Sequence, residues 1–152
     1  MHYAHWMFLV ALLISCTKES GNDSELIRIE SGTSFGFCVG YCAHQVDVTS
    51  QMTTYVRSGT RVDTLPEVSC ELQTKPDVWK DLESLVDDAF FALDSVIGCP
   101  DCFDQGAEFI SVTTSSRSHT VTFDPSLEEM IHPLVERLRL LRETAIESDA
   151  CK

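Results

Sequence analysis

The chain of 152 residues has no hydrophobic run long enough to cross a bilayer. Its longest apolar run, residues 6–14, has nine residues. A membrane-spanning helix needs about 20 residues. The run has instead the length of the apolar region of a secretory signal peptide. The sequence therefore excludes a transmembrane helix as the means of membrane attachment.

Basic residues are few, and they do not cluster. The chain has 11 Lys and Arg against 24 Asp and Glu, which gives a formal net charge of −13. The closest grouping, Arg137, Arg139 and Arg142, is interleaved with Glu136 and Glu143. Because phosphate binding needs a positive surface, we expect no nucleic-acid partner. The acidic composition is typical of an exported protein, because a large net charge keeps such a protein soluble.

The common catalytic motifs are missing as well. The sequence contains no Gly-x-Ser-x-Gly nucleophile elbow, no phosphate-binding loop and no His-Glu-x-x-His metal motif. No catalytic constellation of a known kind can therefore be read from the sequence, and we assign no catalytic residue.

A lipobox-like segment, residues 13–16 (LISC), follows the apolar run. The small Ser15 lets the signal peptidase approach the peptide bond, and the Cys16 thiol is the nucleophile that accepts diacylglycerol. One feature departs from the pattern, because residues 1–5 (MHYAH) contain no Lys or Arg. The alternative is an ordinary signal peptide followed by an incidental cysteine.

Lipidation of Cys16 predicts an envelope protein that is anchored to a membrane by acyl chains such as palmitate. One acyl chain gives only marginal attachment, at about 0.8 kcal/mol per buried CH₂, so two or three chains are expected on this cysteine. Thr17 is not the Asp associated with inner-membrane retention in many Gram-negative bacteria, which favours the outer membrane. The sequence leaves open whether the domain faces the periplasm or the cell surface.

The chain divides into four segments. We expect a lipoprotein signal peptide at residues 1–15, a lipidated Cys16 with a polar tether at 16–25, a single α+β domain at 26–146 and a C-terminal tail at 147–152. The tether contains no apolar residue after Cys16 until Leu26, and it can span at most about 30 Å. The domain is long enough to bury a core of its own.

The hydrophobic pattern of the domain alternates between strand and helix periods. Residues 76–93 carry the clearest helical stripe, with Pro76 at its start and Gly98 as the stop signal. A second helix is expected after Asp124-Pro125, with a kink or a fresh start at Pro133. Strands are expected at residues 26–29, 42–48, 52–57, 107–114 and 118–123, with 68–72 as a possible further strand.

The two halves of the domain repeat one plan, because a cysteine pair precedes a hairpin and a helix in each. This repetition predicts an α+β fold with a ββα-ββα-like layout. Its antiparallel sheet would have about four to five strands, with two helices packed on one face.

The segments 34–42 (SFGFCVGYC) and 98–108 (GCPDCFDQGAE) contain the two cysteine pairs. They resemble the signature segments of an uncharacterised family of small lipoproteins from Gram-negative bacteria, over residues 27–142. The resemblance implies a compact α+β domain behind a lipidated cysteine. It implies no activity, because the family is one of unknown function. Cys70 and Cys151 lie outside the signature segments.

Three interpretations compete for the quartet Cys38, Cys42, Cys99 and Cys102. Disulfides are favoured, because an export signal places the thiols in an oxidising compartment, although local and crossed pairings both stay open. A tetrathiolate zinc site is the second interpretation, and zinc is the only cofactor we consider. Thiol redox catalysis is the third, but the second pair follows a helix rather than opening one, so no helix dipole would lower its thiol pKa.

Other conspicuous residues have structural explanations. His44 and His119 share strand faces with apolar neighbours and are expected to pack as neutral rings beneath a helix. For Asp101, Asp104 and Glu108 we favour turn formation and capping over cation binding. The aromatic residues of segment 35–41 predict either an exposed binding loop or packing on the sheet edge.

We therefore predict a non-enzymatic lipoprotein whose acidic domain binds a protein or another component of the cell envelope. The alternative is a thiol- or zinc-dependent protein that uses the cysteine quartet.

The lipid anchor gives a direct prediction for Cys16→Ser. We expect this variant to remain unprocessed or to become soluble, because no other segment is long enough to hold the bilayer. Metabolic labelling with a radioactive fatty acid checks the assignment. Acyl label that persists on the variant would contradict lipidation at Cys16.

Overall fold

The computed structural model describes residues 24–35, 37–59, 65–127 and 132–147. These residues form one mixed sheet and three helices, an α+β fold. The elements are β1 (Leu26–Ser34), β2 (Ala43–Val48), β3 (Met52–Ser58), β4 (Val68–Gln73), α1 (Pro76–Leu85), α2 (Asp88–Phe91), β5 (Val96–Ile97), β6 (Ala107–Thr114), β7 (Ser118–Phe123) and α3 (Pro133–Glu147).

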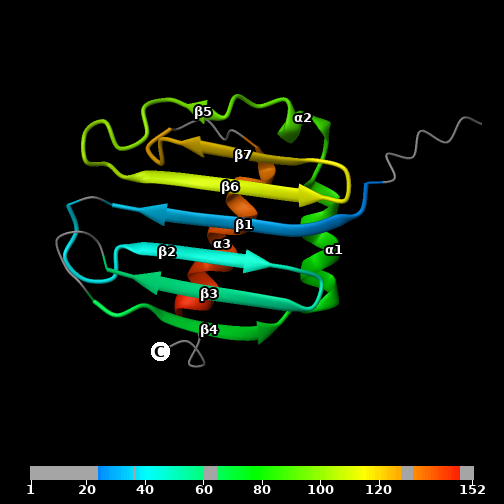
Figure 1. Cartoon of the computed structure of the whole chain (residues 1–152), viewed down its shortest axis with the longest axis horizontal. Coiled ribbons are helices and arrows are strands. Elements are labelled where there is room, and N and C mark those ends of the chain that lie inside the picture. Colours follow the sequence, from blue (N-terminus) through cyan, green and yellow to red (C-terminus); the bar gives the residue numbers. More distant parts are fainter. Residues whose placement is uncertain (1–23, 36, 60–64, 128–131, 148–152) are drawn as a thin grey trace, which may run out of the picture.

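The seven strands lie in the order β4-β3-β2-β1-β6-β7-β5 (Figure 1). The first strand of the domain, β1, is therefore the central one, and it pairs antiparallel with β2 and β6. All other pairings are antiparallel as well, except that β5 runs parallel to β7. The central position of β1 makes it the strand to which both halves of the domain attach.

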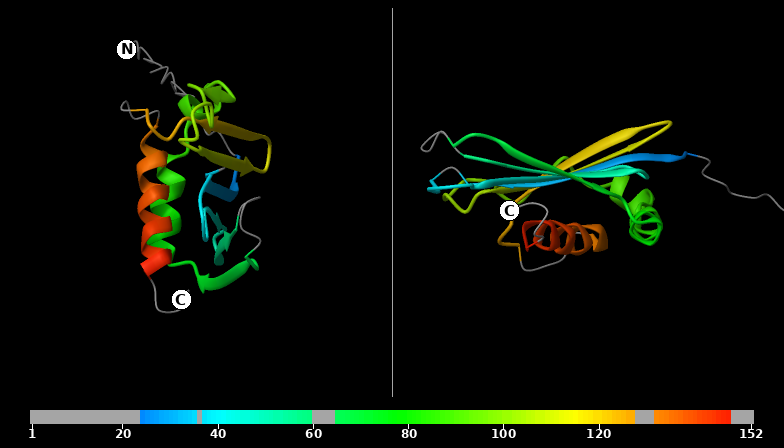
Figure 2. Two further views of the ribbon diagram at one scale, coloured as in Figure 1. Left: turned by 90° about the vertical axis from the view of Figure 1, so that its left-hand side faces the viewer. Right: turned by 90° about the horizontal axis from the view of Figure 1, so that it is seen from below.

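The helices α1 and α3 lie on the same side of the sheet (Figure 2). Strand residues of one parity face them, because side chains alternate between the two faces of a strand. Apart from a small cluster of Tyr55 and Ala145, the buried apolar residues of the strands and helices form one core. Its members are Leu26, Ile29, Val46, Val48, Leu82, Phe90, Ile110, Val112, Val121, Phe123, Leu134, Val135 and Leu138.

The sheet differs from the prediction in size and in layout. It has seven strands rather than four to five, because edge strands β4 and β5 add to the predicted hairpins. The possible strand at 68–72 is confirmed as β4, whereas β5 has only two residues and is too short to produce a periodic pattern. Four strands precede α1, so the order of elements is not the ββα-ββα of the prediction.

The first helix is shorter than its apolar stripe predicts. It ends at Leu85, since Val86 (φ −84°, ψ 112°) and Asp87 (φ −137°, ψ 178°) are extended. The Asp87 carboxylate then accepts a hydrogen bond from the Phe90 N–H (3.0 Å) and caps the short helix α2. A local capping interaction therefore divides the predicted single helix into two.

The fresh start at Pro133 is confirmed, because α3 begins there. Upstream, the Asp124 carboxylate accepts hydrogen bonds from the N–H (2.8 Å) and the hydroxyl (2.7 Å) of Ser126, which makes a turn rather than a helix start. Met130 and Ile131, which the sequence placed on the buried stripe, lie outside the described residues.

The packing of α3 leads to a stability prediction. Leu138 is fully buried against the sheet, whereas Glu136 on the same helix is exposed. Leu138→Ala should lower the free energy of unfolding by about 2–5 kcal/mol, through lost burial and a residual cavity. Glu136→Ala should change it by less than about 0.5 kcal/mol. Denaturant melts measure both, and equal effects of the two substitutions would contradict this packing.

Candidate binding site at the disulfide end of the sheet

The cysteine quartet forms two local disulfides. Cys38 bonds to Cys42 and Cys99 to Cys102, with Cα–Cα distances of 5.8 and 5.5 Å. The disulfide interpretation is therefore confirmed, in its local rather than its crossed pairing. Each bond closes a loop of only a few residues, so each fixes a loop tip rather than linking distant parts of the chain.

Of the three remaining cysteines, Cys70 lies among the described residues. Cys70 on β4 is also disulfide-bonded. Cys16 and Cys151 lie outside the described residues, so the predicted lipidation of Cys16 stays a prediction.

The two disulfide loops lie side by side at one end of the sheet. The loop at 35–42 leaves the end of β1, and the loop at 98–106 enters the start of β6, where Ser34 pairs with Ala107 (Figure 1). The two loops approach each other closely at Gly106 (φ +83°). A Cβ at this position would collide with the Phe35 ring and the Ser34 carbonyl oxygen. Leu26, where β1 begins, lies at the opposite end of the sheet.

The tips of these loops carry the most exposed large apolar side chains of the described chain. Phe37, Val39 and Phe103 are 81%, 83% and 87% exposed. We call these three residues the loop-tip patch. Phe35 and Tyr41 are half-buried instead, so the aromatic segment is divided between an exposed tip and a packed base.

The loop at 98–106 is built by its polar residues. Asp101 (φ 57°) and Asp104 (φ 60°) occupy left-handed turn positions, as their predicted role in turns requires. The Gln105 amide accepts a hydrogen bond from the Phe103 N–H (2.7 Å) and donates one to the Cys99 carbonyl (2.7 Å). Phe103 is thus held outward by the turn rather than by burial.

Glu108, by contrast, is neither a turn residue nor a cap, so that part of the prediction is wrong. It is 2% exposed and lies beneath α3, where it accepts hydrogen bonds from two guanidinium groups. Arg139 donates from Nε (2.9 Å) and Nη2 (2.6 Å), and Arg142 donates from Nη2. The Nη1 of Arg142 also donates to the hydroxyl of the fully buried Ser31. We call these four residues the buried charged cluster.

The cluster belongs to a row of polar side chains that crosses the sheet just below the disulfide loops. Arg57 pairs with His44, His44 with Thr33, and Thr33 with Glu108, across β3, β2, β1 and β6. The guanidinium of Arg57 lies 4.5 Å from the centre of the Tyr41 ring. Its Nε is buried without a hydrogen-bond partner in the part of the chain that the structure describes.

His44 is the titratable centre of this row. Its Nδ1 lies 2.5 Å from the Tyr55 hydroxyl, consistent with its predicted packing as a neutral ring. Burial lowers the pKa of His44, and the neighbouring charges of Arg57 and Arg142 lower it further, against a hydrogen bond to the Tyr41 backbone that raises it. His119 is also packed inward, with its Nε2 2.9 Å from the Leu93 carbonyl oxygen.

An open pocket of about 300 Å³ lies between α3 and this end of the sheet. Three residues of the buried charged cluster, Glu108, Arg139 and Arg142, line it together with apolar side chains. It is lined by Thr33, His44, Glu108, Pro125, Arg139, Arg142, Glu143 and Ile146. We call it the arginine pocket.

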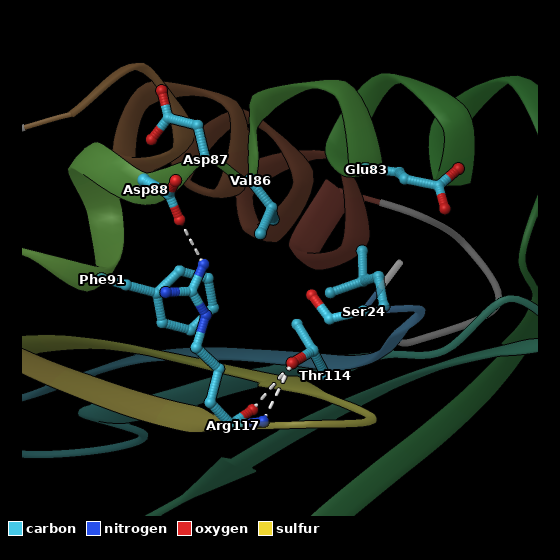
Figure 3. A pocket seen from close by; sticks show the side chains of 9 residues that line it. Ser24, Glu83, Val86, Asp87, Asp88, Phe91, Thr114 and Arg117 are labelled. Atoms are coloured by element: carbon cyan, nitrogen blue, oxygen red, sulfur yellow. Dashed lines mark hydrogen bonds and ion pairs between the residues drawn. The ribbon is translucent and has the colours of Figure 1, made fainter. Parts of the chain in front are cut away.

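A second pocket, of about 390 Å³, lies at the other end of the sheet, where β1 begins (Figure 3). Arg117 lies over the Phe91 ring, 3.7 Å from its centre, and donates to Asp88 (2.5 Å). Asp87 also lines it, and the Phe90 N–H lowers the pKa of this carboxyl, with His132 adding to the effect. Arg117 therefore already supplies a positive charge to the acidic residues of this pocket. Its ion pair with Asp88 ties the β6–β7 turn to α2.

The zinc and redox interpretations of the quartet stay predictions. The two pairs are bonded within themselves, and no group of three or more His, Cys, Asp or Glu side chains there could hold a metal ion. The Cys99–Cys102 disulfide lies in a turn between β5 and β6 rather than at the start of a helix.

No helix among the described residues is long and apolar enough to span a membrane.

The sequence reasoning missed the buried charged cluster, although signals for it were present. Glu108 has the same strand parity as Ile110 and Val112, which face the core. Arg142 follows Leu138 by four residues, so it lies on the same buried stripe of α3. Because Glu108 and Arg142 both occupy inward-facing positions, the sequence could have indicated that they form an ion pair.

No protein-family model matches the chain, and no curated protein matches it in sequence. The resemblance to an uncharacterised lipoprotein family therefore stays a prediction.

The environment of His44 predicts how stability depends on pH. Its pKa in the folded chain lies below the ordinary value of 6.5, so the unfolded chain binds the proton more tightly. His44 should therefore make the free energy of unfolding fall as the pH drops through its unfolded pKa of about 6.5. His44→Gln should reduce this slope. Denaturant melts at several pH values measure it, and an unchanged slope in the variant would show that another group is responsible.

Proposed function

We propose that this chain is a lipid-anchored module of the bacterial cell envelope that binds another envelope protein through its loop-tip patch. The observation that carries the proposal is the grouping of Phe37, Val39 and Phe103 on two adjacent disulfide-closed loops. Single exposed apolar residues are common on protein surfaces, but a group of them marks an interaction site.

The disulfides favour a binding role for these loops. Each bond holds its loop in one shape before a partner arrives, and a preformed loop loses less conformational entropy on binding. The turn around Gln105 adds to this effect, because it fixes the chain on both sides of Phe103. Aromatic side chains on a rigid loop are the kind of group that supplies most of the energy in protein interfaces.

The direction of the loops also supports a partner other than the anchoring membrane. The tether joins the domain at Leu26, and the loop-tip patch lies beyond the far end of the nine-residue strand β1. At about 3.3 Å per residue, β1 alone separates the two ends by about 30 Å. A lipid anchor on Cys16 would then hold one end of the domain and leave the other to reach outward.

Charge favours a protein over a lipid surface. The exposed Asp101 and Asp104 flank Phe103, in a chain with a net charge of −13. Insertion of the loop tips into a membrane that contains anionic lipid would bring these like charges together. A protein surface with an apolar pocket and a basic rim would accommodate both the loop-tip patch and its acidic border.

A photo-crosslinking amino acid at position 39, introduced into the full chain in intact cells, tests the proposal. We expect one discrete protein adduct, and we expect Phe103→Ser to reduce its yield at least about tenfold, as the loss of one interface anchor should. The matched control carries the crosslinker at position 96, since Val96 is also exposed (59%) but lies on β5, outside the loop-tip patch.

The outcomes of this experiment separate the alternatives. The same adduct from positions 39 and 96, or no protein adduct from position 39, would contradict the proposed binding surface. Crosslinks from position 39 to lipid alone would show instead that the loops insert into the membrane.

A further inference from the structure

We propose that the arginine pocket is a binding site for a small carboxylate that carries a short apolar group. This site is distinct from the loop-tip patch, because it lies on the helix side of the sheet. The inference therefore does not depend on the proposed protein partner.

The first observation is the charge balance at the base of the pocket. One carboxylate, Glu108, receives hydrogen bonds from two guanidinium groups, those of Arg139 and Arg142. Glu143, which also lines the pocket, balances the second arginine, and Arg57, next to the lining residue His44 in the sheet row, adds a third guanidinium. One positive charge therefore remains in excess. The site is locally positive in a chain whose net charge is −13.

The second observation is the unequal burial of the two arginines. The Arg142 side chain is 6% exposed, and its terminal nitrogens are engaged by Glu108 and Ser31. The Arg139 side chain is 39% exposed and uses only Nε and Nη2 for Glu108. Among the described residues the Nη1 of Arg139 has no hydrogen-bond partner, so its N–H groups are available to a ligand in the pocket.

A further positive charge, that of Arg57, lies in the row of polar side chains that crosses the sheet. Arg57 has a buried Nε with no hydrogen-bond partner among the described residues, and it lies next to His44, a lining residue. Thr33, between His44 and Glu108 in the row, adds a hydroxyl to the lining. Hydroxyl and guanidinium donors beside an excess positive charge are the groups that recognise an oxyanion.

The size and walls of the pocket narrow the class of ligand. Pro125 and Ile146 add apolar surface to the lining. At about 30 Å³ per water-sized group, the pocket holds roughly ten non-hydrogen atoms. One excess charge suits a monoanion better than a phosphate dianion, and the exposed Glu143 at the rim opposes a second negative charge.

The test uses the full chain purified in detergent, with butyrate, butyramide and inorganic phosphate as probes. Butyrate should bind saturably with one equivalent and shift the side-chain NMR signals of Arg139. Butyramide has the same shape without the charge and should cause no shift. Phosphate should bind more weakly than butyrate.

Matched variants of two arginines on α3 locate the site. Arg139→Gln should weaken butyrate binding at least tenfold. Arg137→Gln should leave it unchanged, because Arg137 pairs with Asp81 on α1 and does not line the pocket. A tetrapeptide with a free C-terminus, compared with its amidated form, then tells whether the carboxylate belongs to a peptide or to a free acid.

The proposal is overturned if butyrate and butyramide behave alike, if neither acid nor free peptide binds, or if Arg139→Gln binds butyrate as well as Arg137→Gln does. Tighter binding of phosphate would also overturn it. The wild-type comparison of butyrate with butyramide decides the question even if a variant fails to fold. Loss of the crosslinked adduct in Phe103→Ser bears only on the loop-tip patch, so the two proposals fail separately.

Discussion

The ion pair between Glu108 and Arg142 is the constraint on which the arrangement of this domain depends. Glu108 lies on β6 beside the central strand, and Arg142 reaches it from α3 while also donating to Ser31 of β1. Both side chains are almost fully buried, so neither charge can be satisfied by water. Removal of one partner from such a pair typically costs about 3–5 kcal/mol, a large part of the roughly 5–15 kcal/mol that holds a domain together. The register of α3 on the sheet is therefore set by charge as well as by its leucines.

This constraint lies close to the end of the sheet that carries the candidate site. Thr33 and Glu108 are the last inward-facing residues before β1 and β6 meet the disulfide loops. The buried charged cluster thus holds α3 against the ends of β1 and β6 from which the disulfide loops extend. The two disulfides act on a smaller scale, because a loop of a few residues restricts the unfolded chain by only about 2 kcal/mol on the chain-entropy estimate. Their main consequence is the fixed presentation of the loop-tip patch.

The two ends of the domain differ in composition, and this difference suits a protein that is held at one end. The end where β1 begins carries a pocket with Glu83, Asp87 and Asp88, in which Arg117 is already paired. The opposite end carries the exposed apolar tips and the locally positive arginine pocket. The three most exposed large apolar side chains of the described residues thus lie at the end away from the predicted anchor.

The sequence by itself determined the elements whose pattern is local. The hairpin of β6 and β7, the strand pair β2 and β3 and the break at Pro133 follow from alternation and helix signals along the chain, whereas the pairing of the cysteines stayed open. Only the tertiary structure decided what depends on contacts between distant segments. The first helix ends before its apolar stripe does, because the Asp87 carboxylate accepts a hydrogen bond from the Phe90 N–H and caps a new helix. The short strand β5 depends on its parallel pairing with β7. Glu108 and Arg142 are 34 residues apart, and neither has a local partner of opposite charge that its own element would bury. Their pairing, and with it the arginine pocket, arises only when α3 is laid across the sheet, because a buried charge is tolerated only where the fold brings its counter-charge.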